Sequence, residues 1–78
     1  MRQDQLKTIK EVISAKSGFE ERNLMMDSLF AEDLNLTDLE LGEILTELEE
    51  KLDVEIKVDV EDIKTVGELI SSFSDVLE

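Results

Sequence analysis

The chain has 78 residues, which suffices for one small domain with a thin core, and we expect residues 1–78 to form that single domain. It contains no cysteine and no histidine, which excludes disulfide bonds, thiolate or imidazole catalysis, and zinc sites built from these residues. Its 21 acidic and 8 basic residues give a net charge of −13, which repels nucleic acid and anionic lipid and favours partners with basic patches. We therefore expect a protein that is not an enzyme and holds no metal ion.

The beginning of the chain is polar, and no apolar run exceeds three residues. This pattern predicts neither a secretory signal nor insertion into a membrane, so we expect a soluble, monomeric, cytoplasmic protein. A first helix is predicted over residues 4–16, because four apolar side chains fall on one side of it, namely Leu6, Ile9, Val12 and Ile13. Gly18 favours the end of this helix.

Residues 18–36 are long for a connection between helices. They contain six large apolar residues, which are Phe19, Leu24, Leu29, Phe30, Leu34 and Leu36. Side chains of this kind can pack against helices, so we expect a long ordered loop rather than a flexible one.

A second helix is predicted from Asp38 to Leu52, because Thr37 and Glu40 form a T-x-x-E capping box at its start. Its core stripe consists of Leu41, Ile44, Leu45, Leu48 and Leu52. At about 100° per residue, Leu39 points roughly 160° away from Leu41. Two interpretations remain open for Leu39: it packs on the preceding loop, or it is an exposed apolar anchor for a partner.

Residues 54–60 alternate apolar and charged side chains, which by itself indicates a half-buried strand. A single strand has no partner for its backbone hydrogen bonds. We therefore expect an extended segment followed by a short helical turn near residues 59–64.

The last predicted helix follows a second capping box formed by Thr65 and Glu68. Its apolar stripe consists of Val66, Leu69, Ile70, Phe73, Val76 and Leu77. The predicted fold is all-α, a small bundle of three main helices and one short helix. A short acidic coiled coil is the alternative architecture, because Leu34, Leu41 and Leu48 are spaced seven residues apart.

Negative charge is concentrated in residues 38–62, which hold eleven acidic residues and two lysines. This distribution predicts either an ordinary solvated face or a surface that attracts a basic partner. A metal-buffering loop over residues 53–62 is a third alternative, but Lys57 lies among its carboxylates and the segment lacks the glycine of a calcium loop.

The stretch FAEDLNLTDLELGEILTELEEKLDVEI, residues 30–56, resembles the central part of bacterial acyl carrier proteins. Those proteins have roughly F-x-E-D-L-G-x-D-S-L, followed by an acidic helix that contains L-E-E. The resemblance extends over nearly the whole chain. It implies the acyl-carrier-protein bundle and partners among enzymes of fatty acid, polyketide or related lipid metabolism.

Asp38 occupies the position at which this family carries phosphopantetheine on a serine. A carboxylate there would give a hydrolysable mixed anhydride instead of a phosphodiester. Ser28 lies ten residues too early for this role, and Thr37 lies one position off. We therefore expect no phosphopantetheine at Asp38 and no other cofactor.

The resemblance also implies which residues of the second helix contact basic patches on partner enzymes. The predicted partner-binding residues are Leu39, Glu40, Glu43, Thr46, Glu47, Glu49 and Glu50. Gly42 and Thr46 depart from the family, which commonly has apolar residues at these positions. The leading hypothesis is an interaction protein that retains the acidic docking helix. The alternative is a functional acyl carrier, either modified at an unusual hydroxyl or locked in its unmodified form by a serine-to-aspartate change.

Overall fold

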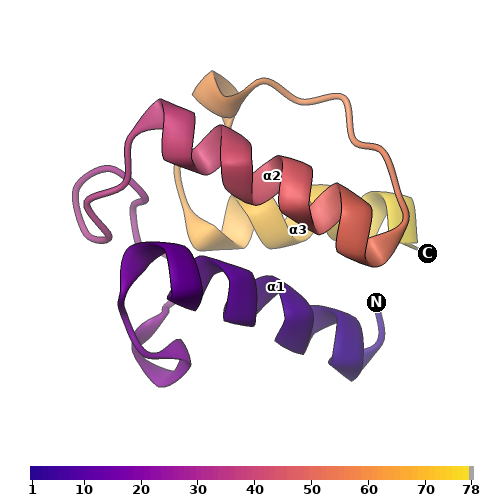
Figure 1. Ribbon diagram of the computed structural model, residues 1–78, viewed down its shortest axis with the longest axis horizontal. Coiled ribbons are helices and arrows are strands. Elements are labelled where there is room, and N and C mark those ends of the chain that lie inside the picture. Colours follow the sequence, from indigo (N-terminus) through magenta and orange to yellow (C-terminus); the bar gives the residue numbers. More distant parts are fainter. Residues whose placement is uncertain (78) are drawn as a thin grey trace.

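Three helices and two short 3-10 turns make up the computed structural model, which describes residues 1–77 (Figure 1). The helices are α1 (Gln3–Ser17), α2 (Asp38–Leu52) and α3 (Val66–Leu77), and the turns are η1 (Glu21–Asn23) and η2 (Val60–Asp62). The predicted all-α bundle is confirmed, and η2 is the predicted short helical turn. The turn η1 was not predicted.

The helices pack with their apolar stripes facing one core. In Figure 1, α1 and α2 run side by side in opposite directions, and α3 lies behind them. The four most buried positions of α2 are Leu41, Ile44, Leu45 and Leu48, as the stripe predicted. At the helix ends the stripes are less buried than predicted: Leu52 and Leu77 are half-buried, and Val76 is exposed.

Both predicted helix boundaries around the first connection are confirmed. Gly18 has a left-handed conformation with φ 81°, and its N–H donates to the carbonyl of Ser14 at 2.9 Å, which ends α1. At the start of α2, the N–H of Glu40 donates to Oγ1 of Thr37 at 3.2 Å, and the N–H of Thr37 donates to Oε1 of Glu40 at 2.9 Å. This reciprocal pair is the predicted capping box.

The long connection is an ordered loop, as predicted. Leu24, Phe30, Leu34 and Leu36 are buried in the core, whereas Phe19 is 39% exposed and contributes less than we expected. The loop is fixed to the start of α3, because the N–H groups of Val66 and Gly67 donate to the carbonyls of Ser28 and Met26. These bonds satisfy backbone donors that have no partner within the first turn of a helix.

Residues 54–59 form an extended segment that returns across the molecule to η2 (Figure 1). Val54 and Ile56 pack against the core, which explains the alternating pattern, but no strand forms within residues 1–77. The N–H of Ile56 donates to Oε2 of Glu49 at 3.0 Å, so a side chain replaces the missing strand partner. Leu34 lies in the loop and not in a continuous helix, which excludes the coiled-coil alternative.

Candidate functional site

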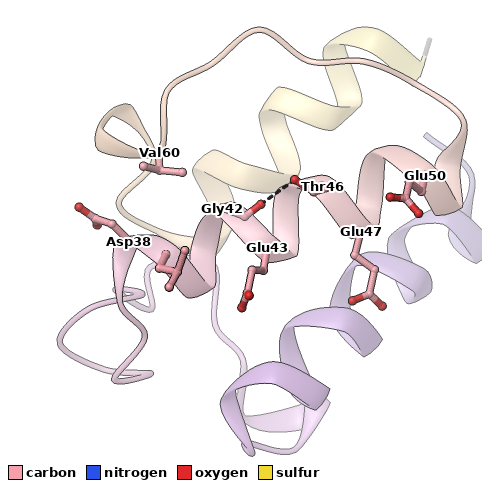
Figure 2. Close-up of a pocket in the computed structure, with 8 residues that line it drawn as sticks. Asp38, Gly42, Glu43, Thr46, Glu47, Glu50 and Val60 are labelled. Atoms are coloured by element: carbon pink, nitrogen blue, oxygen red, sulfur yellow. Dashed lines mark hydrogen bonds between the residues drawn. The ribbon is translucent and has the colours of Figure 1, made fainter.

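An open groove of about 700 Å³ lies along the exposed face of α2 (Figure 2). Seven of its eight lining residues come from α2, and the eighth is Val60 of η2. The α2 residues are Asp38, Leu39, Gly42, Glu43, Thr46, Glu47 and Glu50. They recur at intervals of about one helical turn, which places them on one face of the helix.

Leu39 is the most exposed large apolar side chain of the groove, with 75% of its surface accessible. It therefore does not pack on the preceding loop, and its role as an apolar anchor for a partner stays a prediction. Its neighbours in the groove are carboxylates and Gly42. An apolar side chain among charges is a feature of protein-binding surfaces, where it adds apolar contact to electrostatic attraction.

Three of the predicted acidic residues are exposed and line the groove: Glu43, Glu47 and Glu50. In Figure 2, Glu43 and Glu47 extend from the same side of α2, opposite the side that faces Val60. Asp38 lines the groove at its other end, in the first turn of the helix. An acidic residue is favoured there by the helix dipole, so its presence is compatible with a stable α2.

Glu40 and Glu49 lie outside the groove and make hydrogen bonds within the chain. Bonds from the backbone N–H and the hydroxyl of Thr37 lower the pKa of Glu40 below its ordinary value. Glu49 is half-buried and holds the extended segment through Ile56. The groove thus brings together five of the seven predicted partner-binding residues. A role in partner binding stays a prediction for all seven.

Lys16 of α1 reaches across to the groove, and its Nζ lies 3.0 Å from Oε1 of Glu43. The other ion pairs found within residues 1–77 join residues two to four positions apart. The Lys16–Glu43 pair therefore links two helices. It also shows that a carboxylate of this surface can hold an ammonium group at hydrogen-bond distance.

The two hydroxyl groups considered as alternative attachment points, those of Ser28 and Thr37, are occupied. Ser28 is 8% exposed, and its Oγ accepts the N–H of Met25 at 3.0 Å. Oγ1 of Thr37 accepts the N–H of Glu40 and also donates to its carboxylate at 3.1 Å. Asp38, which lies next to Thr37 at the helix start, offers a carboxylate instead of an alcohol.

A second cavity of about 290 Å³ lies between the loop and η2. Its apolar lining includes Phe30, Leu36, Leu41 and Ile63, and Asp38 lines this cavity as well as the groove. Val60 also lines both, so the two spaces meet at Asp38 and Val60.

Sequence reasoning missed two residues of the site, Val60 and Lys16. The alternating pattern predicted Val60 to be half-buried, but it gave no indication that this side chain would stand beside Gly42. Lys16 is 27 positions from Glu43, and no sequence signal connects them. Both contacts depend on how the elements pack.

Two negative findings concern the part of the chain that the structure describes. No helix among residues 1–77 has the length and apolar character needed to cross a membrane. Over the same range, no three acidic, histidine or cysteine side chains come together as a metal site would require. The metal-buffering alternative therefore gains no support from the geometry of residues 53–62.

Comparisons with known proteins find relatives over most of the chain, although no protein-family model matches it. The acyl carrier protein of Exiguobacterium sibiricum is 36% identical over 64 residues, which cover 81% of each chain. That of Chlamydia trachomatis serovar L2 is 40% identical over 63 residues, covering 80% of this chain and 82% of the relative. That of Clostridium perfringens strain SM101 is 35% identical over 71 residues, covering 90% and 93%.

A solved structure of a candidate acyl carrier protein from Mycobacterium tuberculosis superimposes with a TM-score of 0.80 at 28% identity. The superposition covers 91% of this chain and 96% of that protein. Sequence and structure comparisons thus agree with the resemblance carried by residues 30–56. The chain belongs to the acyl carrier protein family.

Proposed function

We propose that this chain is an acyl-carrier-like interaction protein that binds basic-patched enzymes of acyl or lipid metabolism through α2 and carries no phosphopantetheine at Asp38. The observation that carries the proposal is the carboxylate of Asp38 in the first turn of α2, in an exposed groove that also contains Leu39 and three further carboxylates. The protein would act in the cytoplasm by binding its partners, without catalysing a reaction.

Neither Ser28 nor Thr37 fits a phosphodiester-linked arm. The hydroxyl of Ser28 is buried and serves the loop, and the hydroxyl of Thr37 is part of the helix cap. Modification of the Thr37 hydroxyl would break its cap hydrogen bonds and lower the free energy of unfolding, typically by about 1 kcal/mol. A carboxylate oxygen bonded to phosphorus is an acyl phosphate, which water hydrolyses readily. These features support a protein that works without the arm.

The charge of the groove supports a basic partner. Residues 38–62 carry a net charge of −9 out of −13 for the whole chain. Such a concentration raises the association rate of a positively charged surface and disfavours an acidic one. The 3.0 Å contact from Lys16 to Glu43 is an internal example of the bond that a partner's lysine would form.

The absence of the arm is tested by mass spectrometry. The purified protein is incubated with coenzyme A and a phosphopantetheinyl transferase, and its intact mass is compared before and after. We expect no change for the wild-type chain. Asp38→Ser is the matched variant, because it restores the family's hydroxyl at the same position. A phosphopantetheine adduct on the wild-type chain would favour the alternative, a functional carrier modified at an unusual hydroxyl.

Partner binding is tested separately by pull-down and titration against enzymes of fatty acid and related lipid metabolism that have basic patches. We expect Glu43→Gln and Glu50→Gln to weaken binding, each by about threefold to thirtyfold at low ionic strength. Asp75→Asn on α3 is the control, since it removes the same charge from an exposed residue away from the groove. Binding that responds equally to all three changes would exclude α2 as the docking surface.

A further inference from the structure

Gly42 lines the groove on α2 without a side chain, so the space above its backbone is open. A Cβ atom placed on Gly42 would meet only Cγ1 of Val60, at 3.9 Å, which is an ordinary contact. The packing of the chain therefore does not require a glycine here. Glycine inside a helix lowers the free energy of unfolding by roughly 1 kcal/mol relative to alanine. No contact within the chain at Gly42 offsets this loss of stability.

The surface of the groove around Gly42 is less polar than the residue types that line it suggest. The hydroxyl of Thr46 donates to the carbonyl of Gly42 at 3.1 Å, so its donor is already used within α2 (Figure 2). Val60 and the exposed Leu39 add apolar surface. Glu43, Glu47 and Glu50 then supply negative charge along the same helix face. The groove thus combines an apolar hollow with carboxylates placed along it.

We infer that this groove seats a basic amphipathic helix of the partner protein, with an apolar side chain in the hollow at Gly42 and lysines or arginines against the carboxylates. This inference rests on the proposed function and specifies the partner's shape. The lining residues extend from position 38 to position 50, roughly 18 Å along the helix axis. An open, elongated site of about 700 Å³ accommodates one face of a helix, whose apolar side chains recur every three or four residues.

Charge complementarity selects this occupant over others. The groove has four carboxylates, and two ammonium groups of the described chain approach them: Lys16 lies 3.0 Å from Glu43, and Lys51 lies 4.0 Å from Glu47. Asp38 and Glu50 have no ion pair within residues 1–77. An acidic or neutral helix would leave these charges without partners. A second copy of this chain would bring another net charge of −13 to the same place.

The test uses two synthetic peptides of identical composition. One is an amphipathic helix with a single row of leucines flanked by lysines, and the other is a scrambled sequence with no apolar row. Because both have the same charge, any preference reports on the apolar hollow. We expect the wild-type protein to bind the amphipathic peptide at least about tenfold more tightly, measured by calorimetry or fluorescence titration, which corresponds to about 1.4 kcal/mol.

Gly42→Leu fills the hollow and should abolish this preference while both peptides still bind through charge. Ser71→Leu adds the same side chain to an exposed position of α3 and should leave the preference unchanged. Gly42→Ala fills the hollow only in part and should reduce the preference less. Melting curves establish that each variant is folded, and we expect neither change at Gly42 to lower the melting temperature, because glycine is the poorer helix former.

Glu50→Gln separates this inference from the proposed function, since it should weaken both peptides to the same degree. If Gly42→Leu keeps the full preference, the hollow is not the seat of an apolar side chain and the inference fails, although charge-dependent docking on α2 would stand. If neither peptide responds to Glu50→Gln or to ionic strength, the docking surface itself is refuted.

Discussion

Glycine has opposite roles at two positions of this chain. At Gly42 a side chain would meet only Val60, at 3.9 Å. At Gly67 a Cβ atom would lie 2.8 Å from the carbonyl oxygen of Met26, which is closer than real Cβ atoms come to backbone. The N–H of Gly67 also donates to that carbonyl at 2.8 Å. The contact between the long loop and the start of α3 therefore depends on the missing side chain of Gly67.

These two glycines give a paired stability prediction. Gly42→Ala should raise the free energy of unfolding by about 0.5–1 kcal/mol, because alanine is the better helix former and the space is open. Gly67→Ala should lower it by about 1–3 kcal/mol, since the loop must move away from α3 to admit the new methyl group. Denaturant titrations followed by circular dichroism measure both values. Equal effects at the two sites would contradict the difference in their surroundings.

Glu40 carries a pH-dependent part of the stability. Its pKa is lowered from the ordinary 4.5 by the bond from the Thr37 backbone N–H, with the Thr37 hydroxyl adding to the effect. A depressed carboxyl pKa contributes stability that is present above the unfolded pKa and is lost as the pH falls through the folded pKa. The contribution of Glu40 therefore begins to decline as the pH falls below about 4.5, and it is lost once the pH is below the lowered pKa of the folded state.

Glu40→Gln should for this reason be less stable than the wild-type chain at neutral pH, and the difference should shrink as the pH falls below 4.5. Glu55→Gln, an exposed residue outside the cap, removes the same charge and should slightly stabilise the chain at neutral pH by reducing repulsion. Melting curves at several pH values compare the two variants. A constant difference for Glu40→Gln across this pH range would show that its carboxylate does not support the cap.

At the scale of elements, α1 and α2 are joined by the core and by one charged contact at the surface. The Lys16–Glu43 pair has side chains that are 31% and 53% exposed. Solvent screens pairs of this exposure, so a contribution of about 0.2–1 kcal/mol is expected. The same pair occupies Glu43, which is one of the groove carboxylates.

Lys16→Gln should accordingly have two effects that differ in sign. It should lower the free energy of unfolding by up to about 1 kcal/mol, and it should strengthen binding of a basic peptide by releasing Glu43. Lys7→Gln makes the same charge change at another exposed position of α1 and controls for net charge. The double variant Lys16→Gln/Glu43→Gln should bind no better than Glu43→Gln alone. If Lys16→Gln and Lys7→Gln strengthen binding equally, the effect is one of net charge and not of the pair.

At the scale of the whole molecule, a net charge of −13 on 78 residues works against the compact state. Eleven of the 21 acidic residues lie between positions 38 and 62, in α2 and the segment that follows it. Their mutual repulsion acts across distances that salt screens, with a Debye length of about 10 Å at 0.1 M.

The melting temperature should therefore rise as sodium chloride increases from low concentration, and magnesium should raise it at lower concentration than sodium does. Diffuse screening of this kind requires no bound ion. A melting temperature that does not change with ionic strength would show that repulsion is a minor term in the stability of this fold.

Much of the fold could be predicted from the sequence because its signals are local. Apolar residues one helical turn apart identify a helix wherever it packs, and the boxes at Thr37 and Thr65 mark helix starts through bonds that span three residues. The left-handed residue Gly18 ends α1 for a similarly local reason. The family resemblance and the position of Asp38 at the start of α2 also follow from order along the chain.

Other features were decided only by tertiary structure, because they join residues that are distant in sequence. Packing left Leu39 exposed, engaged Glu49 with Ile56, and brought Lys16 to Glu43. It also placed Val60 beside Gly42, so that an ordinary helix face became a groove. Helical periodicity predicts which side chains share a face of α2. Whether that face forms a groove depends on which other segment packs beside it, and periodicity does not predict that segment.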